Sequence, residues 1–118
     1  MSLPRGTLVI VDLEPTLGHE QCGTRPCLIV SDPAVNDSQR FGLLAVVPIT
    51  GTPAPGALYP PLAPGAHGLT KPSYALVDQL RSIDKRRIRR RHGQVSEAEL
   101  AAIDAGLRLY LGLEPDPG

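Results

Sequence analysis

Short apolar runs separated by polar turns predict strands in the first half of the chain. Residues 7–13 are rich in β-branched side chains, and a Glu-Pro pair ends the run. Residues 26–31 and 43–49 are apolar almost without interruption, which is typical of strands that are covered on both faces. Residues 32–36 between them predict a turn or one short helical segment.

The second half of the chain predicts two more strands and one helix. Residues 74–80 and 89–95 have strand patterns, and 82–86 predicts a turn or a short helical turn. A helix should begin at Ser96, because Glu99 three residues later completes a capping box. One face of this helix carries Leu100, Ile103, Leu107, Tyr110 and Leu111. The glycine that follows them ends the helix.

Residues 51–72 differ in composition from both flanks, since ten of these twenty-two residues are Gly or Pro. No long helix forms in such a segment, and we expect a long loop beside a binding face with at most a short strand near 57–59. Neither flank is large enough to fold alone, so 1–118 should be a single domain. The elements predict a mainly β fold with α: a small, partly open barrel closed by a C-terminal helix.

Charge and amino-acid composition restrict the classes of function that the protein can have. Twelve basic and twelve acidic side chains cancel, but six of the basic ones lie within residues 85–91, and such a patch attracts polyanions even on a neutral protein. A solvated cluster that keeps the protein soluble is the alternative. Aromatic side chains make up only 3% of the chain, so RNA recognition, if present, should rest on hydrogen bonds and pockets rather than on base stacking.

The two cysteines do not suggest a disulfide framework or a zinc site. His19 lies near Cys22 and Cys27, but no fourth ligand follows at a zinc-like spacing, so we predict no metal. The N-terminal apolar stretch lacks the pattern of a signal peptide, and no run reaches membrane-spanning length. We therefore expect a cytoplasmic protein with reduced thiols and no membrane contact.

The stretch from His19 to Pro26, followed by Pro48-Ile49-Thr50, has the most chemical content. Gly23 permits a turn with positive φ, and the proline directly after Arg25 favours an extended backbone at that arginine. Arg25 should therefore lie at the entrance to a strand, where a guanidinium held in place suits an oxyanion such as phosphate.

These residues, with others in the same order along the chain, resemble the MazF/PemK (Kid) toxins, the endoribonuclease half of type II toxin–antitoxin pairs. The matching segments are Arg5-Gly6, Asp12-Leu13-Glu14-Pro15-Thr16, Gly18-His19-Glu20-Gln21, Gly23-Thr24-Arg25-Pro26, Pro48-Ile49-Thr50, Ala75-Leu76-Val77-Asp78-Gln79 and Ser82-Ile83-Asp84-Lys85-Arg86. The resemblance implies an SH3-like barrel of the CcdB/MazF type. It also implies a homodimer whose barrels form an RNA groove, with a MazE/PemI-like antitoxin across it.

The resemblance further implies sequence-selective cleavage of single-stranded RNA, chiefly mRNA, without a metal or other cofactor. The 2′-OH attacks the neighbouring phosphorus and leaves a 2′,3′-cyclic phosphate and a 5′-OH, so DNA should be inert. The sequence agrees with this route, because it lacks clustered carboxylates of the kind that hold paired magnesium ions in metal nucleases. Such a toxin inhibits translation and growth.

Arg25 and Thr50 are the leading catalytic candidates. Arginine stays protonated at physiological pH, so Arg25 should bind the phosphoryl oxygens and stabilise charge in the transition state. A structural salt bridge to Glu20 or Asp78 is the alternative. Thr50 ends an apolar strand, where its hydroxyl could donate to the scissile phosphate or serve only in a turn. Its match to the family's Pro-x-Thr position favours catalysis.

His19 and Asp78 are both candidates for the general base. Histidine, with an ordinary pKa of about 6.5, carries protons readily at neutral pH. In Kid-like toxins the aspartate that matches Asp78 is implicated with an arginine two residues earlier, but this chain has Leu76 there. The difference favours the MazF-type pair and gives Asp78 the alternative role of a structural or RNA-binding acceptor.

Further contacts to RNA are predicted for residues of the same matching segments and their neighbours: Glu20, Gln21, Thr24, Gln79, Arg81, Lys85 and Arg86. Gln79 suits a base edge, and the cations suit flanking phosphates. The basic stretch 85–91 could equally bind the antitoxin or only solvent.

Two other classes of protein share this kind of barrel. One is a CcdB-like poison of DNA gyrase, which binds its target without nuclease activity, and the other is a catalytically silent SH3-like adaptor. Neither needs a phosphate-binding arginine beside a hydroxyl. The combination of Arg25 and Thr50 therefore favours the endoribonuclease.

Overall fold

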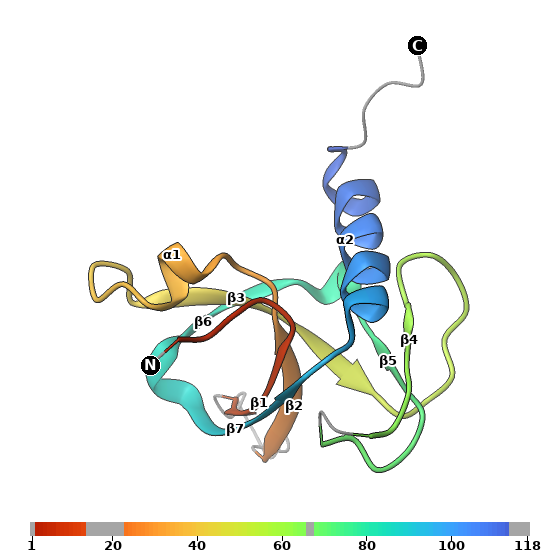
Figure 1. The fold of residues 1–118 in the computed structure, drawn as a ribbon, viewed down its shortest axis with the longest axis horizontal. Helices are drawn as coiled ribbons and strands as arrows, with labels where there is room; N and C mark the ends of the chain where they lie inside the picture. The colour runs from red at the N-terminus through yellow and green to blue at the C-terminus, as the bar shows by residue number, and fades with distance from the viewer. Residues whose placement is uncertain (1, 14–22, 66–67, 114–118) are drawn as a thin grey trace, which may run out of the picture.

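The computed structural model describes residues 2–13, 23–65 and 68–113. Its strands form one curled sheet with a helix standing against it (Figure 1). In chain order the elements are β1 (Thr7–Asp12), β2 (Thr24–Ile29), α1 (Pro33–Asn36), β3 (Leu43–Thr50), β4 (Pro61–Leu62), β5 (Ser73–Ala75), the 3₁₀ turn η1 (Val77–Gln79), β6 (Arg81–Asp84), the 3₁₀ turn η2 (Lys85–Arg87), β7 (Ile88–Gln94) and α2 (Glu97–Leu111). No helix in these described ranges is long and apolar enough to cross a bilayer.

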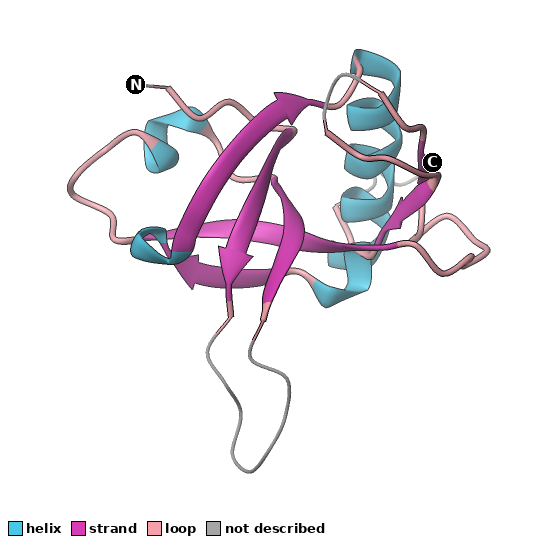
Figure 2. Cartoon of the chain, turned by 90° about the horizontal axis from the view of Figure 1, so that it is seen from below, coloured by secondary structure: helices cyan, strands magenta, loops and turns pink. Residues whose placement is uncertain are grey.

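The sheet is antiparallel and follows the order β4-β5-β3-β2-β1-β7, with β6 paired to β3. β3 changes partner along its length: it pairs with β6 at its start, with β2 further along and with β5 at its end. Two groups of strands run in different directions and curl the sheet into a half-barrel (Figure 2). The predicted mainly β architecture with a C-terminal helix is therefore confirmed.

Each face of the curled sheet carries its own buried cluster, because side chains alternate between faces along a strand. The helix-side cluster contains Leu8, Leu28, Val30, Val47, Ile49, Leu62, Ala75, Val77, Val95 and Ile103. The opposite cluster contains Val9, Val11, Cys27, Ile29, Leu44, Val46 and Ile83. Because β2 and β3 contribute to both clusters, their apolar runs are covered on two sides, as the sequence predicts.

Local sequence and one long-range contact position α2. The Ser96 hydroxyl accepts a hydrogen bond from the Glu99 N–H (3.0 Å), and the Glu99 carboxylate accepts one from the Ser96 N–H (2.9 Å), which confirms the capping box. Gly112 ends the helix with φ 71°, a conformation that favours glycine. Arg5 donates to Asp104 in the middle of the helix (Nη1–Oδ2 3.0 Å) and so ties the start of β1 to α2.

Three predicted elements were wrong in part. The strand predicted at 74–80 ends with β5, because the chain turns through η1 to bury Val77 in the helix-side cluster. The turn predicted at 82–86 is largely strand β6, whose backbone pairs with the start of β3. Tyr110 and Leu111 were expected on the buried helix face but are 47% and 50% exposed, because the end of α2 projects beyond the sheet (Figure 1).

Candidate active site at the parting of two strands

The pairing between β2 and β3 stops before either strand ends. Cys27 opposite Pro48 is the last registered pair, and beyond it β3 is paired only on its other edge, with β5. The two strands therefore diverge. We call the diverging ends, residues 24–26 and 49–51, the fork. Backbone groups within such a fork have lost their ladder partner, which leaves room for a bound molecule.

The fork carries Arg25 on one arm and Thr50 on the other. Continuing the β2–β3 register by two residues sets these two opposite each other. Arg25 is exposed and lies beside Val11 of β1. Among the described residues its guanidinium has no hydrogen bond or ion pair, so the fold leaves it available for an anion.

A second arginine shares this face of the sheet. Arg81 of β6 pairs with Val46, whose side chain lies in the same buried cluster as Cys27. Burial raises the pKa of the Cys27 thiol to about 11, while the positive charges of Arg81 and Arg25 act in the opposite direction. Both guanidinium groups are thus close enough to affect one thiol, and the predicted catalytic Arg25 and the predicted RNA-binding Arg81 form one cationic surface.

The Thr50 hydroxyl accepts a hydrogen bond within a turn and keeps its own hydrogen available for donation. Its Oγ1 accepts a hydrogen bond from the Thr52 N–H (3.1 Å). The hydroxyl is half-buried, and its own hydrogen remains able to donate to a ligand. The turn role considered for this threonine is therefore observed, and the turn contact leaves its hydroxyl hydrogen available.

Asp78 faces a different partner. The Tyr59 hydroxyl donates to its Oδ2 (2.6 Å), and this hydrogen bond raises the pKa of Tyr59. The other oxygen, Oδ1, is buried without a hydrogen-bond partner in the described part of the chain. No ion pair joins Asp78 to Arg25 there. Gln79, the next residue, is exposed. The salt bridge to Asp78 that was the alternative role for Arg25 is thus absent from the described residues.

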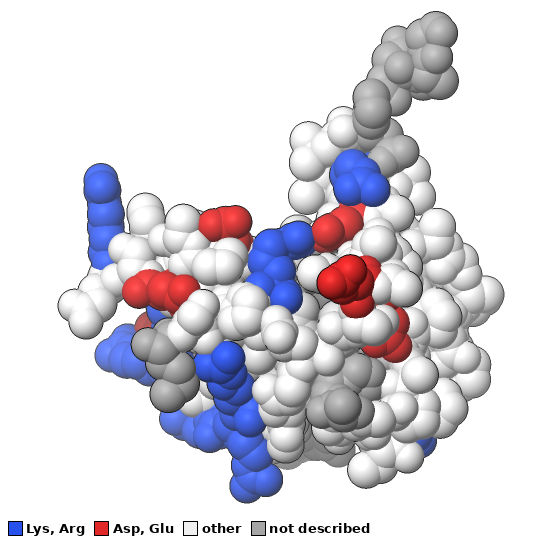
Figure 3. All heavy atoms as spheres, viewed as in Figure 1, with Lys and Arg blue, Asp and Glu red and all other residues white. Residues whose placement is uncertain are grey.

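The basic stretch after β6 is partly occupied by internal contacts. Lys and Arg side chains gather over the β6–β7 side of the face seen in Figure 3. Lys85 donates from Nζ to the carbonyl oxygens of Val35 (2.7 Å) and Ser38 (2.8 Å). Arg86 binds Asp84 through two nitrogens (3.0 and 2.8 Å) and holds the pKa of that carboxyl below its usual range. Both residues predicted to bind RNA here therefore also have structural partners.

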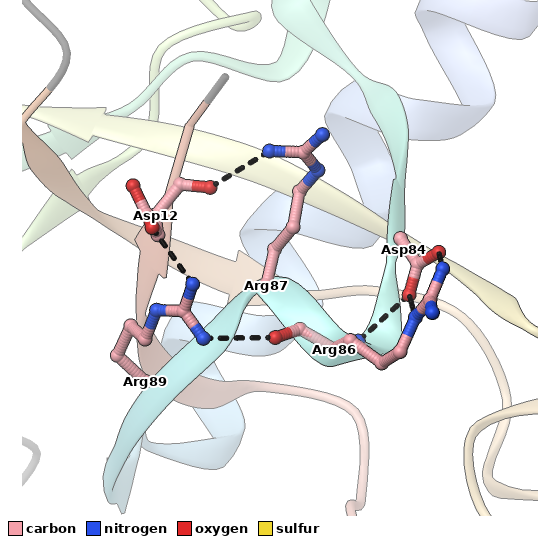
Figure 4. A network of polar contacts seen from close by, with 5 residues as sticks. All are labelled: Asp12, Asp84, Arg86, Arg87 and Arg89. Atoms are coloured by element: carbon pink, nitrogen blue, oxygen red, sulfur yellow. Dashed lines mark hydrogen bonds and ion pairs between the residues drawn. The ribbon is translucent and has the colours of Figure 1, made fainter. Parts of the chain in front are cut away.

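Further along the same stretch, two arginines hold the end of β1 (Figure 4). Arg87 donates to the Asp12 carbonyl oxygen (3.3 Å), and Arg89 donates to the Asp12 carboxylate (2.8 Å). Arg90 and Arg91 are exposed and have no side-chain partner among the described residues. The cations that remain free therefore lie on β7 rather than in η2.

Part of the predicted site lies at the edge of the described region. His19, Glu20 and Gln21 fall outside the described residues. Thr24, the first residue of β2, is exposed and pairs with Asp12 at the end of β1.

The structure adds two residues that the sequence analysis missed. Lys71 lies over the fork: a Cβ built on Gly51 would lie 2.8 Å from its Nζ. His92 of β7 lines the same hollow as Pro26 and Ile49. Neither residue belongs to a motif. Lys71 comes from the Gly/Pro-rich segment and His92 from an edge strand, so only the fold brings them to the fork.

The arrangement offers cationic and hydroxyl donors rather than a metal-ligand set. Within the described ranges no group of three or more His, Cys, Asp or Glu side chains is placed to hold a metal ion. A guanidinium and a hydroxyl are donors of the kind that bind phosphate oxygens. The fold and these residues together define a class: a small half-barrel protein with cationic and hydroxyl donors at the parting of two strands.

Comparison with known sequences places the chain within this class. It belongs to the family of PemK-like, MazF-like toxins of type II toxin–antitoxin systems, whose sequence model matches residues 4–111. The resemblance inferred from the motifs is confirmed.

Individual relatives agree with this assignment. Endoribonuclease MazF9 of Mycobacterium tuberculosis is 37% identical over 115 residues, which cover 92% of this chain and 96% of that protein. Endoribonuclease MazF of Staphylococcus epidermidis is 28% identical over 109 residues, covering 92% and 91%. The MazE–MazF crystal structure from Deinococcus radiodurans superposes with a TM-score of 0.79 at 29% identity, covering 97% of this chain and 99% of that one.

Proposed function

We propose that this chain is the toxin of a type II toxin–antitoxin pair, a cytoplasmic endoribonuclease that cleaves single-stranded RNA, chiefly mRNA, and so inhibits translation and growth. The observation that carries the proposal is the fork, whose two arms carry Arg25, without a side-chain partner among the described residues, and the hydroxyl of Thr50. The curated relatives are named endoribonucleases, which supports the same activity.

The proposed reaction needs no metal. The 2′-oxygen forms a bond to the adjacent phosphorus as its proton passes to a base, and the bond from phosphorus to the 5′-oxygen breaks. The 5′-oxygen takes up a proton, which leaves a 2′,3′-cyclic phosphate and a 5′-OH. Arg25 binds the non-bridging oxygens, where negative charge grows, and Thr50 donates its hydroxyl hydrogen to the same phosphate.

The position of Asp78 supports His19 as the general base. The Asp78 carboxylate is engaged by Tyr59, and its other oxygen is buried. Histidine has a pKa suited to proton transfer near neutrality. Asp78 then serves to hold η1 and the neighbouring Gln79 in place rather than to take the proton.

The proposed assembly is a homodimer that binds a MazE/PemI-like antitoxin. A related protein from Deinococcus radiodurans was crystallised as a MazE–MazF complex. Arg81 and the free arginines of β7 give this chain a cationic surface that suits either RNA or an acidic antitoxin segment. Thr24, Gln79, Glu20 and Gln21 remain proposed RNA contacts.

The decisive experiment is incubation of the purified protein with a defined RNA in EDTA. We expect cleavage that yields a cyclic phosphate and a 5′-OH, and no cleavage when the 2′-OH at the cut site is replaced by hydrogen. Arg25→Ala and Thr50→Val should each slow cleavage by about 10²–10³-fold, as loss of a transition-state donor does.

The matched control is Arg40→Ala. Arg40 is also exposed, but it lies over the Phe41 ring in the loop before β3 and should leave the rate unchanged. Near wild-type cleavage by Arg25→Ala with an unchanged circular dichroism spectrum would contradict the proposed role. A 5′-phosphate product would indicate a different mechanism.

A further inference from the structure

Arg25 and Thr50 belong to one row of side chains that crosses the sheet. Val11 of β1 pairs with Arg25, and the register continued through the fork sets Arg25 opposite Thr50. On its other edge Thr50 pairs with Tyr74 of β5. Residues directly opposite each other in antiparallel strands project from the same face, with Cβ atoms about 4.5–5.5 Å apart. Tyr74 is therefore the next side chain in the row after the proposed catalytic pair.

The two neighbours of Tyr74 on β5 indicate the same face. Ser73 is 4% exposed and lines the hollow on the helix side of the sheet, and Ala75 belongs to the helix-side cluster. Side chains alternate between the faces of a strand, so Tyr74 projects from the opposite face. Cys27, two residues after Arg25, lies in the buried cluster of that face. Arg25 and Tyr74 thus share one face of the sheet.

The Tyr74 hydroxyl is available to a ligand. The residue is half-buried, and its hydroxyl makes no hydrogen bond among the described residues. Its oxygen is not one of the buried atoms that lack a partner, so it reaches the surface. The Tyr59 hydroxyl, in contrast, donates to Asp78 (2.6 Å), and Tyr110 lies near the end of α2, beyond the sheet (Figure 1). Of the three tyrosines, Tyr74 alone presents an available phenol beside the fork.

The proposed reaction requires a proton donor that the catalytic pair does not supply. As the bond from phosphorus to the 5′-oxygen breaks, that oxygen becomes an alkoxide unless it receives a proton. Arg25 stays protonated in water, so it binds negative charge and does not readily give up a proton. Thr50 is an alcohol and no stronger an acid than the ribose hydroxyl that leaves. A tyrosine is a phenol, which is a stronger acid than an alcohol and can act as a general acid.

The other proton donors near the fork, Lys71 and His92, lie on the other side of the sheet. Both line the hollow that also contains Ile49, a residue of the helix-side cluster. They therefore approach the fork from the helix side, whereas Thr50 and Tyr74 project from the opposite face. Tyr74 is thus the described residue that combines a transferable proton with a position next to Thr50.

We propose that Tyr74 is the general acid of the cleavage reaction, an inference that rests on the proposed endoribonuclease function. The Tyr74 O–H bond breaks as the bond from phosphorus to the 5′-oxygen breaks, and the proton passes to that oxygen. The product is a 5′-OH, and water then returns a proton to the tyrosinate. The three side chains of the row have separate roles: Arg25 binds the non-bridging oxygens, Thr50 donates to the same phosphate, and Tyr74 protonates the leaving group.

The test uses two RNA substrates in EDTA that contain one mapped cut site. One is ordinary RNA, and the other has sulfur in place of the 5′-bridging oxygen at the cut. A thiolate leaves without being protonated, so the sulfur substrate needs no general acid. Tyr74→Phe removes only the hydroxyl, and Tyr110→Phe on α2 is the matched control.

On ordinary RNA, Tyr74→Phe should lower kcat by about 10²–10³-fold and change KM by less than about three-fold, and Tyr110→Phe should match the wild type. On the sulfur substrate, Tyr74→Phe should cut within about ten-fold of the wild-type rate, because the missing proton is no longer required. Arg25→Ala should remain slow on both substrates, since charge still grows on the non-bridging oxygens.

Each outcome decides between the proposals. Recovery of Tyr74→Phe on the sulfur substrate, without recovery of Arg25→Ala, supports the general acid. If Tyr74→Phe has an unchanged circular dichroism spectrum and cuts ordinary RNA at the wild-type rate, the role is overturned. Equal impairment of Tyr74→Phe on both substrates also overturns it, because the hydroxyl then acts otherwise than by donating a proton. If the wild type cuts neither RNA, the proposed endoribonuclease function itself fails, whatever the variants do.

Discussion

Cys27 lies at the boundary between the buried core and the exposed candidate site. Its side chain is 1% exposed and lies in the opposite cluster, while Arg25 comes two residues before it on the same strand face. A neutral thiol fits the buried position, and a thiolate does not. The side chain therefore acts as apolar filling beneath a cationic surface.

The thiol gives a pH prediction. Burial raises the folded pKa of Cys27 to about 11 from the ordinary 9.0, so the unfolded chain loses this proton first and stability falls as pH rises from 9.0 to about 11. We expect Cys22→Ser to lose about 2 kcal/mol more than Cys22→Ser/Cys27→Ala over this range. Urea unfolding at pH 8.5 and 10.5 measures it. Equal losses in both proteins would contradict the burial argument.

At the residue scale, the sequence predicted the positions of those site residues that belong to a local sequence pattern. Arg25 precedes a proline and Thr50 ends an apolar run, so each could be assigned to a strand end, and register then sets them across the fork. Lys71 and His92 have no such pattern. They reach the fork because two glycines let them approach, which depends on tertiary packing alone.

Among the elements, α2 was the most predictable and the 74–80 segment the least. A capping box and a terminal glycine define the ends of α2 locally. In contrast, β5 forms by pairing with β3, and η1 forms where Val77 packs in the helix-side cluster. The pattern of apolar residues could not distinguish a continuous strand over 74–80 from a strand followed by a 3₁₀ turn, because Val77 is buried and apolar in either case. Elements stabilised by local contacts are predictable from sequence, and those that depend on distant partners are not.

The capping box gives an element-scale prediction. Ser96→Ala removes the acceptor for the Glu99 N–H and should lower the free energy of unfolding by about 1 kcal/mol. Ser82→Ala, at an exposed strand position, is the control and should change it by less than about 0.5 kcal/mol. Urea denaturation measures both. An equal effect of the two substitutions would show that the cap contributes nothing.

At the scale of the whole molecule, the half-barrel is held by contacts between distant parts of the chain. Arg5 and Asp104, 99 residues apart, join the start of the sheet to α2, and Arg5 also donates from Nε to the Val30 carbonyl oxygen (2.7 Å). Asp104 raises the pKa of Arg5 through this hydrogen bond. The motifs indicated the family, but only the fold shows that this pair connects sheet and helix.

A double-mutant cycle tests that connection. Asp104→Ala leaves a half-buried guanidinium without its acceptor and should cost about 1–3 kcal/mol of stability. Arg5→Ala should cost a similar amount, and the double variant should cost less than the sum by about 1 kcal/mol. Urea unfolding of the four proteins gives the coupling. Strict additivity would mean that the pair does not interact in solution.

The exchange of partners along β3 has an evolutionary consequence. The proposed catalytic pair, Arg25 and Thr50, lies where the pairing of β3 with β2 ends, whereas Lys71 and Gly68 belong to the segment that connects β3 to β5. That connection can drift in length and chemistry without disturbing the anchored pair. Relatives of this protein should therefore differ more in this connection than in the two strand ends that carry Arg25 and Thr50.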